Sequence, residues 1–204
     1  LKDFYADDFR IGFAVAPHWL FRPECDSAIR KHASTLTAEN NMKPERLLDR
    51  AATLAAGSEV RAVFDFRPAA RLLDYARDRG IPVRFHTLVW HNQTPAWFFE
   101  AAAGTQADTA TMRQRMRDYI HNVAGRYAGK VQAWDVVNEI MGEYGQYRDT
   151  VWTRAYGGDG DALVRDAFRF ASEAAPDAEL YYNDFNAWRP EKRDGIVRMV
   201  KMLQ

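Results

Sequence analysis

The sequence predicts an α/β protein that supplies the first five β/α units of an eight-stranded (β/α)8 TIM barrel. Short apolar segments rich in Val, Ile, Phe, Tyr and Thr alternate with amphipathic segments of helical period. Several apolar segments lack strict alternation, as is typical of parallel strands that are covered on both faces. The first of them, "RIGFAVAPHW", contains a single glycine and no phosphate-binding fingerprint, which disfavours a dinucleotide-binding fold.

The expected strands are the apolar segments themselves. In chain order they are residues 9–16, 34–40, 81–90, 131–139 and 178–186. Strand followed by helix, repeated along the chain, predicts a parallel sheet with right-handed crossovers.

The expected helices lie after four of these strands, over residues 66–80, 111–130, 161–176 and 190–204. In the second of them, Met112, Met116 and Ile120 form an apolar stripe among Arg and Asp residues. Gly80 and Pro176 are expected to end the first and third helices, and Pro190 to begin the last.

The number of units predicts an incomplete barrel. Five units leave two parallel edges exposed and the interior unfilled, so we expect residues 1–204 to be the N-terminal part of one barrel, with strands 6–8 absent from this chain. The chain opens Leu1-Lys2-Asp3 without an initiator Met, and we therefore expect a mature or trimmed product.

The composition argues against nucleic acids and membranes as partners. The 28 basic and 28 acidic side chains give a formal net charge of zero, so there is no basic stripe for a nucleic acid. No segment approaches the roughly 18 apolar residues of a membrane span. The single cysteine, Cys25, excludes an internal disulfide and a cysteine metal cluster.

Polar and aromatic side chains gather at the ends of the expected strands, where a barrel places its chemistry. They are Glu39, Asn40 and Lys43; His86, Trp90 and Gln93; Asn138 and Glu139; and Tyr182 and Asn183. Aromatic rings offer faces for sugar C–H groups, and amides and carboxylates pair with vicinal hydroxyls. His86 and His91 are five residues apart and would point to opposite faces of a strand, so we expect no metal and no cofactor.

Four of these segments together resemble the family 10 glycoside hydrolases, which are endo-1,4-β-xylanases. The segments are "TAENNMKPE", "HTLVWHNQTPAWF", "WDVVNE" and "YYNDFN", and they occur in the family's order along nearly the whole chain. The resemblance implies a (β/α)8 barrel that cleaves the β-1,4 bonds of xylan or xylo-oligosaccharides with retention of configuration.

The resemblance also implies a role for each matching residue. Glu139 matches the general acid/base, and Asn138 the amide that contacts the nucleophile and the 2-hydroxyl of the sugar that is cleaved. His86 and Trp90 match residues around that sugar. Glu39, Asn40, Lys43 and Gln93 match groups that hold the non-reducing side of the substrate, and Tyr182 and Asn183 match the leaving-group side.

A carboxyl group at the end of an apolar strand fits this chemistry. An alkoxide is a poor leaving group, so the glycosidic oxygen must be protonated as its bond breaks. A second carboxylate across the sugar raises the pKa of such an acid. In retaining enzymes the two carboxyl groups lie roughly 5–5.5 Å apart, and the second one attacks the anomeric carbon.

The second carboxylate is the main departure from the family pattern. In the family it belongs to a "TELD"-like segment on strand seven, beyond Gln204, and we assign the role to no acidic residue present. We therefore expect this chain alone to lack double-displacement activity, and a complementary C-terminal polypeptide is a candidate partner. The family resemblance favours secretion, although intracellular members exist.

Alternatives remain at this stage. The chain could be a catalytically silent, xylan-binding partial barrel, or another β-1,4-glycanase of the same clan. Glu139 could be a helix-start carboxylate, His86 a core imidazole and Lys43 a solvated surface charge. Trp97 is expected to be structural, and Asp135 mainly structural.

Overall fold

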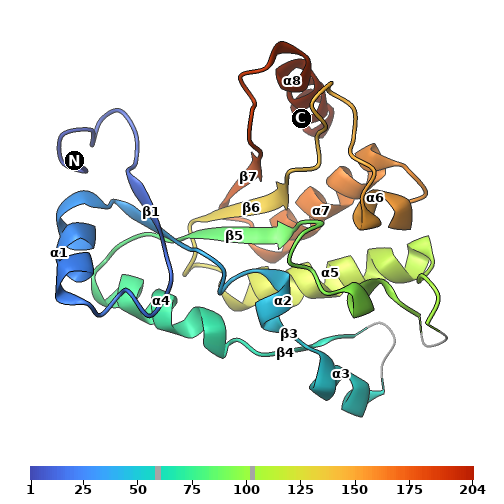
Figure 1. Cartoon of the computed structure of the whole chain (residues 1–204), viewed down its shortest axis with the longest axis horizontal. Helices are drawn as coiled ribbons and strands as arrows, with labels where there is room; N and C mark the ends of the chain where they lie inside the picture. The colour runs from blue at the N-terminus through green and yellow to red at the C-terminus, as the bar shows by residue number, and fades with distance from the viewer. Residues whose placement is uncertain (58–60, 102–103) are drawn as a thin grey trace.

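The computed structural model describes residues 1–57, 61–101 and 104–204, and five parallel strands form its frame (Figure 1). They are β1 (Gly12–Val15), β2 (Thr35–Ala38), β5 (Arg84–Val89), β6 (Ala133–Asn138) and β7 (Glu179–Asn183). All five lie within the segments expected to be strands, but each is shorter, because the flanking residues form the connections.

The five strands form an open arc in chain order. β1 pairs with β2, and β5, β6 and β7 form a three-stranded parallel sheet. A parallel bridge between Leu36 and Val83 joins the two sheets, and the Leu36 N–H donates to the Pro82 carbonyl at 2.9 Å. Among the described residues, β1 and β7 form the two edges of the arc, and the arc does not close.

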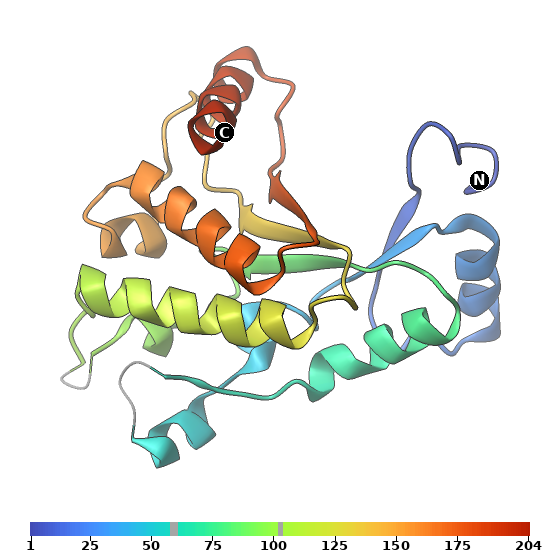
Figure 2. The same cartoon turned by 180° about the vertical axis from the view of Figure 1, so that it is seen from behind.

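Three of the long helices pack along one side of this arc, and the last lies beyond β7 (Figures 1 and 2). The predicted ones are α4 (Arg67–Asp78), α5 (Thr109–Arg126), α7 (Gly160–Ala174) and α8 (Pro190–Leu203). α8 begins at Pro190 as expected, and α7 ends two residues before Pro176. Each of the five strands is thus followed by at least one helix, whereas the sequence predicted helices after four of them.

Several elements were not predicted. They are α1 (Pro23–His32), α2 (Pro44–Leu47), α3 (Arg50–Ala56), α6 (Val151–Ala155), the 3₁₀ helix η1 (Ala96–Phe99) and the antiparallel pair β3 (Leu48–Asp49) and β4 (Val63–Phe64). In α1 only Ile29 is buried, so its sequence shows too little apolar periodicity to indicate a helix.

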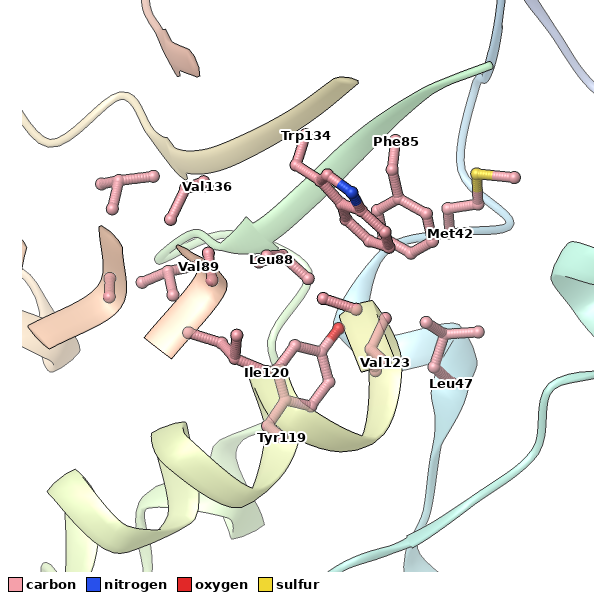
Figure 3. Close-up of a cluster of buried hydrophobic side chains, with 14 of the residues drawn as sticks. Met42, Leu47, Phe85, Leu88, Val89, Tyr119, Ile120, Val123, Trp134 and Val136 are labelled. Atoms are coloured by element: carbon pink, nitrogen blue, oxygen red, sulfur yellow. The ribbon is translucent and has the colours of Figure 1, made fainter. Parts of the chain in front are cut away.

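The core lies between the strands and the covering helices. Phe85 and Trp134 on neighbouring strands are fully buried, with ring centroids 4.5 Å apart. Figure 3 shows them above Tyr119, Ile120 and Val123 of α5. Burying one such side chain contributes about 1.5–3 kcal/mol, so this layer fixes the positions of β5 and β6.

The opposite face of the arc is polar. Because side chains alternate along a strand, Arg84 and His86 of β5 and Asp135 of β6 point away from the buried Phe85 and Trp134. With Tyr181 of β7 they line a hollow of about 710 Å³. Asp135 is 3% exposed and forms an ion pair with Arg84, so a buried carboxylate on this face is paired, as its desolvation requires.

Candidate active site

The carboxyl ends of β2, β5, β6 and β7 meet at one rim of the arc, because the strands are parallel. The predicted site residues lie at or just beyond these ends. Asn40 and Lys43 follow β2, Trp90 and Gln93 follow β5, Asn138 ends β6 with Glu139 next to it, and Asn183 ends β7.

Glu139 is held in an unusual backbone conformation. Its φ angle is +55°, in the left-handed region that costs a non-glycine residue about 1–3 kcal/mol. Its N–H donates to the Asn183 carbonyl at 2.9 Å, and the Trp90 indole N–H donates to Glu139 Oε2 at 3.1 Å. The carboxyl group is therefore oriented at the rim from two neighbouring strands.

Lys43 lies against the same indole. Its ammonium group donates to Asn40 Oδ1 at 2.9 Å and lies 5.0 Å from the centre of the Trp90 ring. Only 8% of Lys43 is exposed. Burial lowers the pKa of Lys43, and the negative charges of Glu45, Glu39 and Glu139 act in the opposite direction.

Gln93 joins Asn40 from the other side. Its side-chain amide donates to Asn40 Oδ1 at 3.2 Å and to Glu45 Oε1 at 3.0 Å. Its φ angle of +49° is a second left-handed conformation at the rim. One continuous set of contacts thus connects three strand ends. Its members are Asn40, Lys43, Trp90, Gln93 and Glu139.

His86 and the two asparagines complete the cluster below the rim. His86 Nδ1 lies 2.9 Å from Asp135 Oδ2, where an N–H donates to the carboxylate, and the His86 ring centre is 6.0 Å from that of Trp90. The Asn183 side chain donates to Asn138 Oδ1 at 2.8 Å. The amide beside Glu139 is therefore fixed by β7.

Two predicted site residues stand apart from this set. Glu39 follows β2 and is exposed, and no side-chain hydrogen bond to it is found within the described ranges. The Tyr182 hydroxyl points into the protein, where it accepts from the Met141 N–H at 3.0 Å and donates to Asp184. Burial, followed by the hydrogen bond to Asp184, raises the pKa of Tyr182.

The structure differs in some features from the site that the sequence predicted. Asp135, which was expected to be mainly structural, pairs with Arg84 and contacts His86. Glu45, bonded to Gln93, was not considered. The expectation that His86 and His91 occupy opposite faces of one strand is wrong, because β5 ends at Val89.

The described residues show neither a metal-binding cluster nor a membrane-spanning helix. In residues 1–57, 61–101 and 104–204, no group of three or more His, Cys, Asp or Glu side chains is arranged to hold a metal ion. Within the same ranges, every helix is too short or too polar to span a bilayer.

Comparisons with known proteins give consistent matches. The model of the family described as glycosyl hydrolase family 10 matches residues 1–204. The chain is 44% identical to endo-1,4-β-xylanase A of Thermotoga neapolitana, with all of this chain and 19% of the relative covered. It is 43% identical to endo-1,4-β-xylanase B of Paenibacillus barcinonensis, with 98% of this chain and 56% of the relative covered.

Solved structures agree with the sequence matches. The crystal structure of xylanase XynB from Paenibacillus barcinonensis, in complex with a conduramine derivative, superposes on all of this chain and 57% of its own, with a TM-score of 0.87 and 40% identity. A Clostridium thermocellum endo-1,4-β-D-xylanase 10B structure in complex with xylohexaose gives a TM-score of 0.88 at 30% identity, over 98% of this chain and 42% of its own. The five-stranded arc is therefore part of a (β/α)8 barrel, and the predicted fold class is confirmed.

Proposed function

Because the chain belongs to glycosyl hydrolase family 10, we propose that it supplies the N-terminal part of the catalytic barrel of a retaining endo-1,4-β-xylanase. The chain spans 19% of the Thermotoga relative and 56% of the Paenibacillus one, so the complete barrel includes residues that are not in this sequence. The substrate is xylan or a xylo-oligosaccharide, and the protein is secreted.

Glu139 is the general acid/base. The observation that carries this role is the position of its carboxyl group, which lies at the rim under the Trp90 indole N–H, directly after Asn138. In the first step, the protonated carboxyl gives its proton to the glycosidic oxygen as the bond to the leaving sugar breaks. In the second step, the carboxylate takes a proton from the water that attacks the glycosyl ester.

The nucleophile comes from the segment that completes the barrel. Two acidic side chains of the described ranges, Asp184 and Asp135, are engaged otherwise, because Asp184 is paired with Lys192 and Asp135 with Arg84 and His86. A retaining mechanism needs a carboxylate roughly 5–5.5 Å from the acid, across the sugar. The segment that completes the barrel would bring this carboxylate to the polar face of the arc, beside β7.

The set of contacts around Lys43 binds the non-reducing side of the substrate. Lys43, Asn40 and Gln93 offer donors and acceptors on neighbouring strand ends, which suits vicinal sugar hydroxyls. His86 and Trp90 contact the sugar that is cleaved, and Glu39 adds an exposed acceptor. Asn183 and Tyr182 belong to the leaving-group side.

The decisive experiment replaces Glu139 with Gln in a completed barrel. The completed barrel is this chain followed by the C-terminal segment of the Paenibacillus barcinonensis xylanase. We expect E139Q to lower kcat on xylan by about 10²–10⁴-fold, because proton transfer to a poor leaving group is lost. On an aryl xylobioside with an acidic phenol as the leaving group, glycosyl transfer to the enzyme needs no proton, so its burst of phenol should persist.

The control is Glu24→Gln, at the exposed first turn of α1, which should leave both rates unchanged. Undiminished cleavage of xylan by E139Q would remove Glu139 from the mechanism. Tight binding of xylo-oligosaccharides by titration calorimetry, without turnover in the completed barrel, would favour a silent binding protein instead.

A further inference from the structure

The segment that follows Glu139, residues 140–150, is docked on the far side of the rim against β7 and α8. The Arg148 N–H donates to the Ile140 carbonyl at 2.8 Å, and Arg148 Nε donates to the Met141 carbonyl at 2.9 Å. These bonds close the segment on itself. Its attachment to the rest of the fold depends on three further groups of contacts.

The first attachment is a buried cation. Lys192, in the first turn of α8, is fully buried. Its ammonium group lies 2.9 Å from Asp184 Oδ1 and 3.0 Å from Glu143 Oε1. One buried charge therefore joins α8, the end of β7 and the segment that follows Glu139.

The second attachment is the Tyr182 hydroxyl. It accepts from the Met141 N–H at 3.0 Å and donates to the Asp184 carboxylate, whose side chain is 1% exposed. The raised pKa of Tyr182 keeps its proton in place for that donation. The order of contacts is thus Lys192, Asp184, Tyr182 and then the backbone of Met141, two residues after Glu139.

The third attachment is a close approach of two glycines. A Cβ on Gly195 of α8 would lie 2.6 Å from the Gly145 Cα, and one on Gly145 would lie 2.4 Å from the Glu191 carbonyl oxygen. Arg198 also donates to the Gly145 carbonyl at 2.7 Å. The segment is therefore seated directly on the α8 backbone.

We infer that Tyr182, Asp184 and Lys192 act as positioning residues for Glu139. The left-handed conformation of Glu139 is unfavourable for a glutamate, so it persists only if the chain on both sides is fixed. Asn138 is fixed within β6, and the Tyr182 hydroxyl fixes Met141. The inference rests on the proposed function of Glu139, and it gives Tyr182 a task beyond contact with the leaving group.

The first test needs no activity and uses the chain as it is. Tyr182→Phe removes the acceptor of the Met141 N–H, so we expect hydrogen exchange of that amide to accelerate by at least about tenfold, since its buried hydrogen bond is lost. Tyr75→Phe is a matched control, because Tyr75 donates to Asp26, which pairs with Arg79, in a similar arrangement between α1 and α4. It should leave Met141 exchange unchanged.

Unaltered Met141 exchange in Y182F would overturn the inference. If Y182F fails to fold, Asp184→Asn gives the second test, and it should also accelerate Met141 exchange. If neither variant folds, exchange in the unaltered chain decides, because a Met141 amide that exchanges as fast as that of exposed Tyr144 is not held.

The second test uses the completed barrel. Misplacement of the acid should lower kcat of Y182F on xylan by about 10–100-fold with little change in KM, and should lower the rate on an aryl xylobioside much less. A role in stability alone would reduce both rates equally, as Y75F should if it reduces either. Failure of the proposed function appears separately, as an E139Q variant that cleaves xylan normally.

Discussion

Glu143 joins the segment that follows Glu139 to α8 through charged contacts. Its carboxylate accepts from Arg189 at 2.7 Å and from Lys192 at 3.0 Å, and Arg148 lies 3.7 Å away. The hydrogen bond from Arg189, followed by that from Lys192, lowers the pKa of Glu143 to about 2. The folded protein therefore holds this carboxylate ionised at a pH where the unfolded chain protonates it.

This gives a pH dependence with a defined direction. The contribution of Glu143 to stability should be fully present above its ordinary pKa near 4.5 and should be lost as the pH falls towards about 2. Thermal unfolding between pH 6 and pH 2 should show Glu143→Gln with a lower Tm at pH 6 and a shallower fall in Tm on acidification. Glu24→Gln should keep the fall of the unaltered chain, and identical slopes for E143Q and the unaltered chain would contradict the assignment.

At the residue scale, the sequence could predict which residue types gather at the rim but not the direction of each side chain. Asn40, Lys43, Trp90, Gln93 and Glu139 form the set of contacts expected from their places after parallel strands. The orientation of Tyr182 could not be predicted, because its hydroxyl partners lie 41 residues away at Met141 and two residues away at Asp184. Such pairings depend on tertiary packing, which spacing along the chain does not encode.

At the scale of elements, the contact between α8 and the segment after Glu139 depends on Gly195. In most helices a change from Gly to Ala stabilises by about 1 kcal/mol. Here the added Cβ would lie 2.6 Å from the Cα of Gly145, which is backbone and cannot rotate away. Overpacking of this kind costs about 1–3 kcal/mol, so the clash should outweigh the gain in helix propensity.

Gly195→Ala should therefore lower the free energy of unfolding, by about 1 kcal/mol, in urea titrations followed by circular dichroism. Gly125→Ala within α5 is the matched control, because its Cβ would lie 4.0 Å from the nearest atom, the Ala174 carbonyl oxygen. G125A should raise stability by about 0.5–1 kcal/mol. An equal gain in both variants would show that α8 does not press on Gly145.

Helices and strands could be predicted from the sequence where their buried apolar residues recur at a regular spacing. The five strands and the four long helices cover a core, so their apolar residues recur regularly, as Met112, Met116 and Ile120 do in α5. β3 and β4 are strands of two residues each, which are too short to show such a pattern. α1 was missed for a related reason, because it buries a single Ile29 and is otherwise polar.

At the scale of the molecule, the arc has one covered face and one open polar face. The helix-covered face holds a continuous apolar core, whereas the other holds Arg84, Asp135 and Tyr181 around a hollow of about 710 Å³. In the ion pair between Arg84 and Asp135, the side chain of Asp135 is buried, whereas the side chain of Arg84 is 35% exposed. In a closed (β/α)8 barrel this face would lie in the interior, which the strands enclose.

Completion of the barrel should therefore be needed for catalysis. We expect this chain alone to release no reducing sugar from xylan, because Glu139 lacks a facing nucleophile, and the same chain joined to the C-terminal segment of the Paenibacillus barcinonensis xylanase to be active. Carboxymethylcellulose should be a much poorer substrate for the joined protein, because a sugar that bears a hydroxymethyl group would have to fit the same site. Comparable rates on both polymers would favour a β-1,4-glucanase of the same clan, and xylan cleavage by the isolated chain would mean that one of its own carboxylates attacks the sugar.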